Sequence, residues 1–176
     1  HRAIADAASI PLVYHSYLVG PKSIETLRRV LEVPAVIAMK QETNDFMQYA
    51  LLRDSFGDRL GVMAGAGGEL AYYAHQCGAV GSLTGTGQWA PGPERRFVEQ
   101  MLTGDFAGAR EHLDRILPYR RSWAATNNNT VAIKFAMDLA GFCGGPPRPM
   151  AGIALTAKQQ DELAEIVRAT GLISRT

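Results

Sequence analysis

Short, mainly apolar segments alternate with helical segments in the first half of the chain, and this alternation constrains the fold more than any other feature. The apolar segments cover residues 10–14, 35–40, 60–64 and 79–83. They are mainly apolar along their length rather than at every second residue, which is typical of parallel strands covered by helices. The alternation predicts an α/β fold with a parallel sheet. From the residues alone, an open doubly wound sheet and a (β/α)8 barrel both fit.

The second half of the chain, from Pro91 onward, reads as a series of helices. Asp105 can cap the second of them. A polar loop is expected over residues 123–129, before a further helix. Thr156 and Gln159 stand at the spacing of a capping box, which predicts the start of the last helix.

Composition and charge narrow the classes of function. The chain has 176 residues, of which 47% are hydrophobic and 20% charged, and its net charge is +1. Such a balance gives no reason to expect a nucleic acid or a charged membrane surface as a partner. No apolar run reaches the roughly 18 residues that a membrane-spanning helix needs. We therefore expect no nucleic acid and no membrane as a partner.

The two cysteines, Cys77 and Cys143, stand in unrelated contexts. This favours reduced thiols in a cytoplasmic protein over a disulfide framework. His75 and Cys77 form an H-x-C pair, but no second pair lies nearby at metal-ligand spacing. A helix end with a buried cysteine is the better interpretation, and we expect no metal site.

Lys40 ends the second apolar segment and Tyr14 ends the first. If these segments are neighbouring strands of a parallel barrel, their carboxyl ends open into the same mouth. A lysine amine that is partly withdrawn from water can attack a ketone there and form a Schiff base. A phenol beside it can relay protons between the intermediates. Two plainer interpretations also fit, because a strand-ending lysine is commonly solvated and a strand-ending tyrosine can simply pack.

Two glycine-rich turns follow the third and fourth apolar segments, at residues 65–68 and 84–87. Their backbone N–H groups suit a carboxylate or a phosphate, although glycines needed only for tight turns explain the sequence equally well. Residues 85–90 also fit the G-x-G-x-x-A pattern of nicotinamide-binding folds. Pro91 and Pro93 delay the next helix, and no further strand supplies the acidic residue that this pattern requires, so it fits a dinucleotide site poorly.

Six stretches of the sequence, taken together, form a pattern that no single motif shows. They are residues 11–14 (PLVY), 36–43 (VIAMKQET), 62–65 (VMAG), 78–84 (GAVGSLT), 102–113 and 131–145. In order and spacing, from end to end of the chain, they resemble the C-terminal part of the dihydrodipicolinate synthase/N-acetylneuraminate lyase family of Schiff-base aldolases and dehydratases. The resemblance implies a (β/α)8 TIM barrel. Residues 1–90 would hold its second half, strands 5–8, and residues 91–176 the last barrel helix and a C-terminal helical extension.

The resemblance also implies roles for single residues. Lys40 is expected to form the imine with a 2-oxo acid, and Tyr14 to relay protons. Gly65 and Leu83 are expected in the substrate pocket, partly through backbone groups. No metal and no cofactor are implied, and the partners expected are a small 2-oxo acid and further copies of the chain, in a tetramer or dimer. The first four barrel strands, with the threonine pair that binds the pyruvyl carboxylate, are expected to lie outside this sequence.

Two positions depart from the pattern of the lysine-pathway synthases. His15 follows Tyr14 where those enzymes carry Asn, and no Arg follows within residues 16–20 to bind a substrate carboxylate. This favours a different 2-oxo acid, such as a sugar acid, and makes His15 a substrate-binding candidate. Glu42 follows Lys40 by two residues. It can lie in the same mouth as a second acid–base group or binding group, or it can be a solvated loop residue.

The sequence therefore predicts a Schiff-base lyase, either an aldolase or a dehydratase. Its substrate is expected to be pyruvate or a 2-oxo acid such as a 2-keto-3-deoxy sugar acid. Dihydrodipicolinate synthase proper is one alternative. A catalytically silent family member that binds a small metabolite is another, and an oxidoreductase that uses Gly85 and Gly87 is a third.

Overall fold

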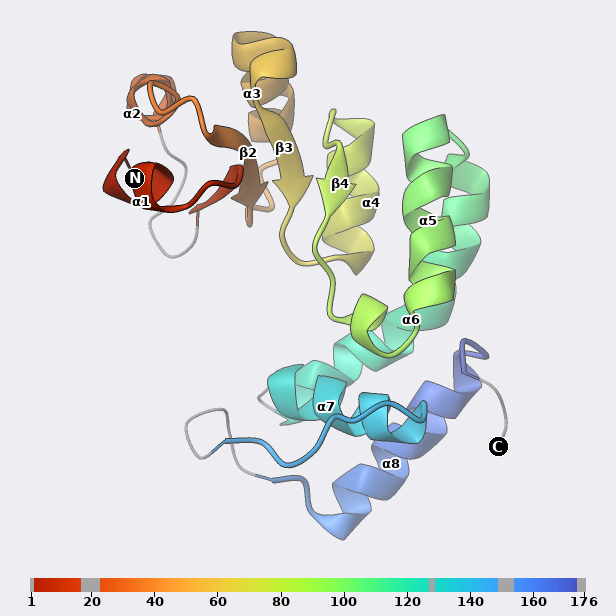
Figure 1. Ribbon diagram of the computed structural model, residues 1–176. Coiled ribbons are helices and arrows are strands. Elements are labelled where there is room, and N and C mark those ends of the chain that lie inside the picture. The colour runs from red at the N-terminus through yellow and green to blue at the C-terminus, as the bar shows by residue number, and fades with distance from the viewer. Residues whose placement is uncertain (1, 17–22, 127–128, 149–153, 174–176) are drawn as a thin grey trace. The chain divides into compact units, whose positions relative to one another are not determined.

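The computed structural model of the protein describes residues 2–16, 23–126, 129–148 and 154–173 (Figure 1). The chain divides into two compact units, His1–Leu83 and Thr84–Thr176. They are called the first and the second unit below. The predicted division after residue 90, between half barrel and helical extension, stays a prediction.

The first unit alternates strands and helices as the apolar segments predict. Its helices are α1 (Arg2–Ala7), α2 (Ile24–Val30), α3 (Met47–Phe56), the short 3₁₀ helix η1 (Gly57–Arg59) and α4 (Gly68–Gln76). Its strands are β1 (Leu12–Ser16), β2 (Val36–Gln41), β3 (Gly61–Ala64) and β4 (Gly81–Ser82). All neighbouring strands are parallel, and their order in the sheet is their order in the chain (Figure 1). This sequential order is the one that a (β/α)8 barrel requires.

The strand boundaries differ from the predicted ones by one or two residues. β1 begins at Leu12 and continues to Ser16, so His15 lies in the strand and Tyr14 does not end it. Pro11 has no N–H group for a ladder hydrogen bond, and the first bond of the ladder is donated by the N–H of Leu12 to the Ala35 carbonyl. β2 ends at Gln41, one residue after Lys40, and β4 is shorter than predicted.

The core of the first unit lies between one face of the sheet and its helices. Val36, Met39 and Val62 from the strands are at most 2% exposed, and α2 and α3 contribute Leu27 and Leu52. Burial of each such side chain contributes about 1.5–3 kcal/mol. This packing fixes β2, the strand that carries Lys40.

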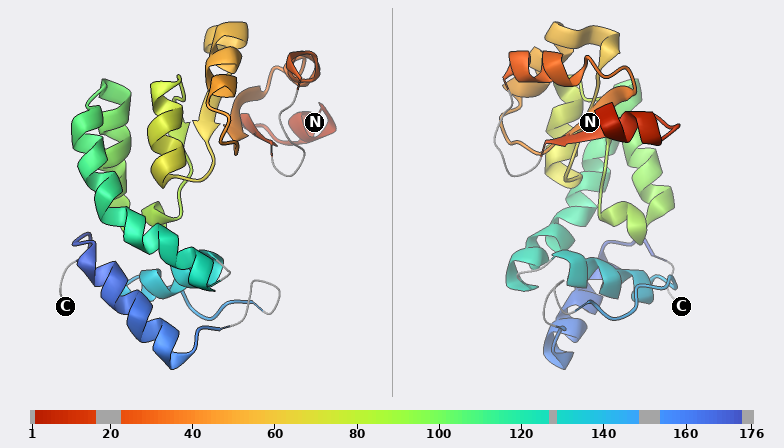
Figure 2. Two further views of the ribbon diagram at one scale, coloured as in Figure 1. Left: turned by 180° about the vertical axis from the view of Figure 1, so that it is seen from behind. Right: turned by 60° about the vertical axis from the view of Figure 1, so that its left-hand side comes forward.

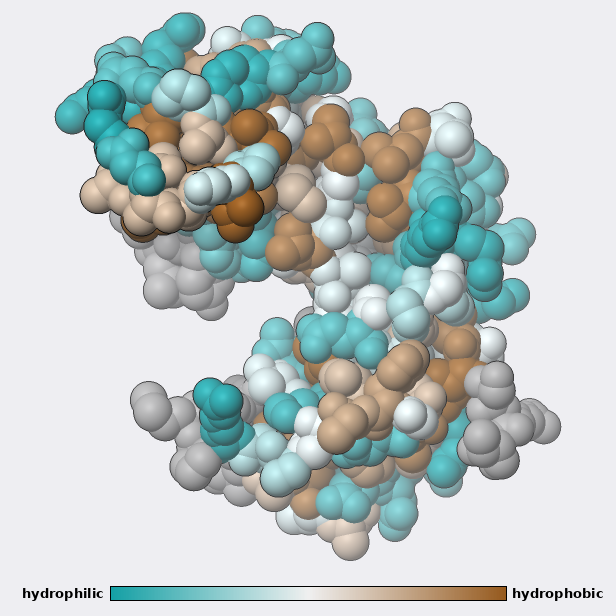
Figure 3. All heavy atoms as spheres, viewed as in Figure 1, coloured by the Kyte–Doolittle hydropathy of each residue, from teal (hydrophilic) through white to brown (hydrophobic). Residues whose placement is uncertain are grey.

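Some apolar side chains of the first unit remain at its surface, where Figure 3 shows brown residues among teal ones. Val13 and Ile37 are 52% and 49% exposed, and Val80, just before β4, is 57% exposed. Parallel sheets are usually covered on both faces. In this unit the surface near the strands is therefore apolar and open.

The second unit is helical. It contains η2 (Thr86–Gln88), α5 (Pro91–Thr103), α6 (Phe106–Thr126), α7 (Asn129–Leu139) and α8 (Ala157–Ala169). Figure 2 shows α6 and α8 from two further sides. The predicted caps are confirmed: Asp105 Oδ1 accepts the Gly108 N–H at 3.0 Å, and Thr156 and Gln159 form a capping box.

The polar loop predicted over residues 123–129 is wrong at its start, because α6 continues to Thr126. The helix also passes through Pro118, which lacks the N–H that an interior position would donate. Ile116 and Tyr119, on either side of this proline, are fully buried. Their packing offsets the cost of the proline and carries the helix onward.

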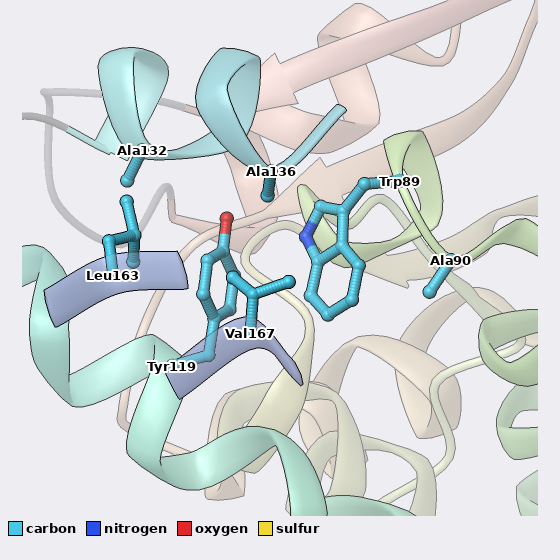
Figure 4. Packing of buried hydrophobic residues seen from close by; sticks show 7 residues of the cluster. All are labelled: Trp89, Ala90, Tyr119, Ala132, Ala136, Leu163 and Val167. Carbon is cyan, nitrogen blue, oxygen red and sulfur yellow. The ribbon is translucent and has the colours of Figure 1, made fainter. Parts of the chain in front are cut away.

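The core of the second unit forms around Trp89 and Tyr119, whose rings meet edge to face with centroids 4.9 Å apart (Figure 4). Ala132 and Ala136 of α7 and Leu163 and Val167 of α8 close the cluster. Small residues on one helix therefore face large ones on the others, which is how close-packed cores interdigitate. Among the described residues, no helix is both long enough and apolar enough to span a membrane.

Candidate active site

β2 presents Lys40 near the carboxyl end of the parallel sheet. The strand is anchored at its start by Arg59, whose guanidinium donates to the carbonyls of Leu31 and Val36 at 2.8 and 2.6 Å. Met39, the residue before the lysine, is 1% exposed. The side chain of Lys40 is 19% exposed, so it is neither in the core nor fully solvated.

Glu42 joins Lys40 to His15. Its carboxylate oxygen Oε1 forms an ion pair with Lys40 Nζ. The same oxygen lies 3.2 Å from His15 Nε2. The side chain of Glu42 is 21% exposed and that of His15 is 43% exposed. His15 of β1 and Lys40 of β2 therefore contact the same oxygen atom of Glu42, which follows directly after β2.

The register of β1 on β2 explains which residues meet. His15 pairs with Lys40, and Tyr14 pairs with the buried Met39. Residues paired across a sheet share a face, and successive residues of a strand alternate between faces. An irregularity between Leu12 and Val13 sets this register. The backbone thus aligns His15 with the lysine, and the proton-relay role of Tyr14 stays a prediction.

Gly65, directly after β3, makes room for Glu42. A Cβ atom added at Gly65 would lie 2.1 Å from Glu42 Cγ and 2.8 Å from Glu42 Oε1. The Gly65 N–H donates to the carbonyl of Gln41 at 2.9 Å. The structure therefore places Gly65 beside the predicted site residue Glu42, and its N–H is bonded to Gln41, the residue before Glu42.

Tyr49 of α3 holds the same backbone from the other side. Its hydroxyl donates to the Gln41 carbonyl at 2.8 Å, and its side chain is fully buried. Burial is the largest cause that raises the pKa of Tyr49 to about 12, and the negative charge of Glu42 adds to it. Gln41 Nε2 also donates to Gln48 Oε1 at 3.0 Å. The peptide between Lys40 and Glu42 is thus fixed by β3 and by α3.

Tyr49 is not among the site residues predicted from the sequence. The signal that points further is chemical, because a buried phenol needs a hydrogen-bond partner. Gln41 gives a second signal: it is 2% exposed, although it follows directly after Lys40. Both residues support the site without belonging to the predicted set.

The remaining candidates lie at the ends of β3 and β4 and beyond. Leu83 donates its N–H to the Ala64 carbonyl at 2.8 Å, and its side chain is 42% exposed. Gly67 and Gly68 adopt positive φ angles of 63° and 53°, and α4 begins there. In the second unit, Thr86 of the predicted nicotinamide pattern is buried in η2. In the described parts of the chain, no three or more His, Cys, Asp or Glu side chains gather as a metal site would require.

Comparison with known proteins decides the family. The Dihydrodipicolinate synthetase family matches residues 2–170. The chain belongs to this family. The 4-hydroxy-tetrahydrodipicolinate synthase of Parvibaculum lavamentivorans is 27% identical over 178 residues, which cover 98% of this chain and 60% of that protein. The chain spans about three fifths of the length of such curated relatives.

Solved structures of the family share the fold. The dihydrodipicolinate synthase of Oceanobacillus iheyensis superposes with a TM-score of 0.83 at 20% identity, over 97% of this chain and 57% of that one. The N-acetylneuraminate lyase of Proteus mirabilis gives a TM-score of 0.79 at 22% identity, over 98% and 59%. The predicted fold, part of a (β/α)8 TIM barrel, is confirmed.

Proposed function

We propose that this chain carries the reactive lysine of a class I lyase and that Lys40 forms a Schiff base with pyruvate or another 2-oxo acid. The observation that supports this most is the position of Lys40, whose side chain is 19% exposed near the carboxyl end of β2 and in contact with Glu42. Carboxyl ends of barrel strands carry the chemistry of such folds. Membership of the Dihydrodipicolinate synthetase family supports the same assignment.

The chemistry needs only the amine and its neighbours. Attack of Lys40 Nζ on the keto carbon, followed by loss of water, gives a protonated imine. This imine withdraws electrons from the adjacent carbon, so a carbon–carbon or carbon–oxygen bond next to it can break or form. The iminium is itself the electron sink, and the proposal invokes no metal and no cofactor. Gly65, Leu83 and His15 are proposed to line the pocket, with Tyr14 as a proton relay.

We favour a sugar acid, such as a 2-keto-3-deoxy acid, as the substrate. His15 stands next to the strand tyrosine, and residues 16–20 contain no Arg to bind a second substrate carboxylate. Residues 17–20 lie outside the described part of the chain. The second candidate is the reaction in the name of the relatives, synthesis of 4-hydroxy-tetrahydrodipicolinate, which is favoured by those names. We further propose a cytoplasmic homo-oligomer, a tetramer or dimer, which light scattering of the purified protein would test.

Borohydride trapping tests the proposal. The full-length protein is incubated with pyruvate and sodium borohydride, and the adduct is located by peptide mass spectrometry. We expect a reduced, stable adduct on Lys40. It should be absent in Lys40→Arg, which keeps the charge but lacks a nucleophilic amine, and present in the matched control Lys158→Arg at an exposed helix position. No adduct on the unmodified protein would refute the proposal and favour a catalytically silent binder.

Product analysis then separates the two candidate reactions. A 2-keto-3-deoxy sugar acid is expected to be cleaved or dehydrated by the protein and left unchanged by Lys40→Arg. Formation of 4-hydroxy-tetrahydrodipicolinate without turnover of the sugar acid would overturn the preferred substrate class and leave the Schiff-base chemistry in place.

A further inference from the structure

Two helices of the first unit, α3 and α4, carry apolar and aromatic side chains on their outer surface. The surface consists of Phe46, Met47, Leu51, Tyr72 and Tyr73 and is called the α3–α4 patch below. We infer that two copies of the chain associate through this patch about a twofold axis. The inference rests on the homo-oligomer proposed above and names its contact surface, and it does not depend on the Schiff-base chemistry.

The patch is open to solvent at its centre. Met47 and Leu51 are one turn apart on α3 and are 74% and 53% exposed, and Tyr73 of α4 is 43% exposed. Residues four apart lie on the same face of a helix. The centroid of the Tyr73 ring lies 5.5 Å from that of Phe46 and 5.2 Å from that of Tyr72. The aromatic rings of α4 therefore reach the end of α3 that carries Met47.

The opposite faces of both helices are used by the core of the first unit. Tyr49 and Leu52 of α3 and Ala71 and Ala74 of α4 are at most 3% exposed. In Figure 1 both helices lie behind the strands, on the same side of the sheet. The exposed side chains of the patch therefore point away from the sheet.

A continuation of the barrel does not cover this surface. α3 and α4 follow β2 and β3, the two inner strands of the sheet, so neither helix lies at a sheet edge. Further strands of a barrel add beside the outer strands β1 and β4. The helices of a (β/α)8 barrel form its outer ring, so the outer face of α3 and α4 stays outside a closed barrel. A second molecule is therefore the occupant that fits the patch.

The charges beside the patch favour a second copy of the chain. The exposed Asp45 precedes α3, and Arg53 lies in its last turn. Each is four residues from position 49, the midpoint between Met47 and Leu51. A twofold axis near this midpoint packs two α3 helices antiparallel. It brings Asp45 toward Arg53 of the partner subunit, so that opposite charges and opposite helix-dipole ends meet.

Arg53 can serve a second carboxylate. Its Nε and Nη2 atoms donate to Asp54 Oδ1 of the same chain at 3.0 and 2.8 Å. This pair neutralises Asp54 next to the patch and leaves the Nη1 atom of the guanidinium for Asp45 of the partner subunit. The border of the patch thus complements its own copy.

The centre of the patch also suits a twofold contact. Around such an axis the same surface meets itself, so its members have to tolerate their own copies. The five side chains of the patch carry no charge at neutral pH, and no repulsion arises when they meet. Tyr, Phe and Met are enriched in protein interfaces, and Met adapts its shape to the surface opposite.

Light scattering of the full-length protein over a dilution series tests the inference. Leu51→Glu places a carboxylate in the patch, and Leu102→Glu on α5 is a matched control, because the two helix leucines are 53% and 54% exposed. We expect Leu51→Glu to raise the dissociation constant by about a hundredfold or more, since the twofold axis puts both copies of the substitution into one interface. Leu102→Glu should leave it within about threefold of the original.

The outcomes separate the two proposals. If the unmodified protein is a monomer at every concentration, the proposed homo-oligomer fails and the inference falls with it. If it is an oligomer and Leu51→Glu leaves its dissociation constant unchanged, only the inference is overturned. An equal weakening by Leu102→Glu would overturn it as well, because the loss is then not confined to the patch. Circular dichroism reports whether each variant is folded, and Met47→Glu is a second variant with the same expected effect.

A charge exchange tests the antiparallel arrangement. Asp45→Lys faces Arg53 of the partner subunit and should raise the dissociation constant about tenfold, because symmetry counts an exposed ion pair twice. Adding Arg53→Glu to the same chain should return the constant to within about threefold of the original, since the two charges have changed places. A double variant that associates no more tightly than Asp45→Lys alone would overturn this arrangement.

Discussion

Replacing Gly65 with Ala tests the site at its tightest contact. The added Cβ would stand 2.1 Å from Glu42 Cγ. Carbon atoms in contact are comfortable at about 3.5 Å, so Glu42 Cγ has to retreat by roughly 1.4 Å, the difference between these two distances. Cγ is not the flexible tip of the side chain, and the whole carboxylate moves with it. The 3.2 Å contact between Glu42 Oε1 and His15 Nε2 is then lost.

The expected magnitudes differ between activity and stability. Gly65 is not among the glycines with positive φ, so Ala meets no backbone strain there. Loss of partly exposed ion pairs costs about 0–1 kcal/mol, and a compatible Gly→Ala change returns about 0.4–1 kcal/mol. The free energy of unfolding should therefore stay within about 1 kcal/mol of its original value. Imine formation should slow about a hundredfold, which is about 2.7 kcal/mol in the activation barrier, because a misplacement of about 1 Å beside a reacting group can cost this much.

The assay measures stability and the rate of imine formation, and the rate is measured again in a Glu42→Ala background. Urea unfolding followed by far-ultraviolet circular dichroism gives the stability, and timed borohydride quenching gives the rate at Lys40. In a Glu42→Ala background no Cγ atom stands in the way, so Gly65→Ala should then change the rate less than twofold. A loss of the same size in both backgrounds would refute the steric argument and point to the substrate pocket or the Gln41 backbone instead.

Two further predictions concern buried polar groups. Tyr49→Phe removes the hydrogen bond to Gln41 and should cost about 1 kcal/mol, since the carbonyl keeps the Gly65 N–H as a partner. Because the pKa of Tyr49 is raised to about 12 from about 10 in the unfolded chain, its contribution is full below pH 10 and is lost as the pH rises toward 12, so urea midpoints of the two proteins should converge there. Glu94→Leu leaves the buried His112, 3.0 Å from Glu94, without this acceptor and should lower stability by about 3 kcal/mol in urea unfolding. A change below about 0.5 kcal/mol would contradict that estimate.

Much of the fold follows from the sequence because burial on both faces leaves a plain signature. β2 was predicted to within one residue from an apolar run bounded by Pro34. β1 begins two residues later than predicted, since Pro11 is an apolar residue but has no N–H group to donate to the hydrogen bonds of the sheet. The length of α6 escaped prediction, because tertiary packing of Ile116 and Tyr119 outweighs the local effect of Pro118.

The sequence predicted which residues belong to the candidate site, but it did not predict how their side chains are arranged. Lys40, Glu42, His15 and Gly65 were each named from the sequence, and the structure brings these four together. The shared oxygen depends on the register of β1, which an irregularity beside Val13 sets, and no spacing rule reveals such an irregularity. The support from Tyr49 was missed because the sequence does not show whether the hydroxyl of a buried tyrosine forms a hydrogen bond with the site.

The Trp89–Tyr119 pair has a practical consequence for spectroscopy. The chain has two tryptophans, at positions 89 and 123, and both belong to the second unit. Intrinsic tryptophan emission therefore reports on the helical unit, while the unit that holds Lys40 and Glu42 contains only tyrosines and phenylalanines as chromophores. An emission curve can stay unchanged while the first unit melts. A tryptophan placed at Phe46, beside α3, would give that unit a fluorescent signal of its own.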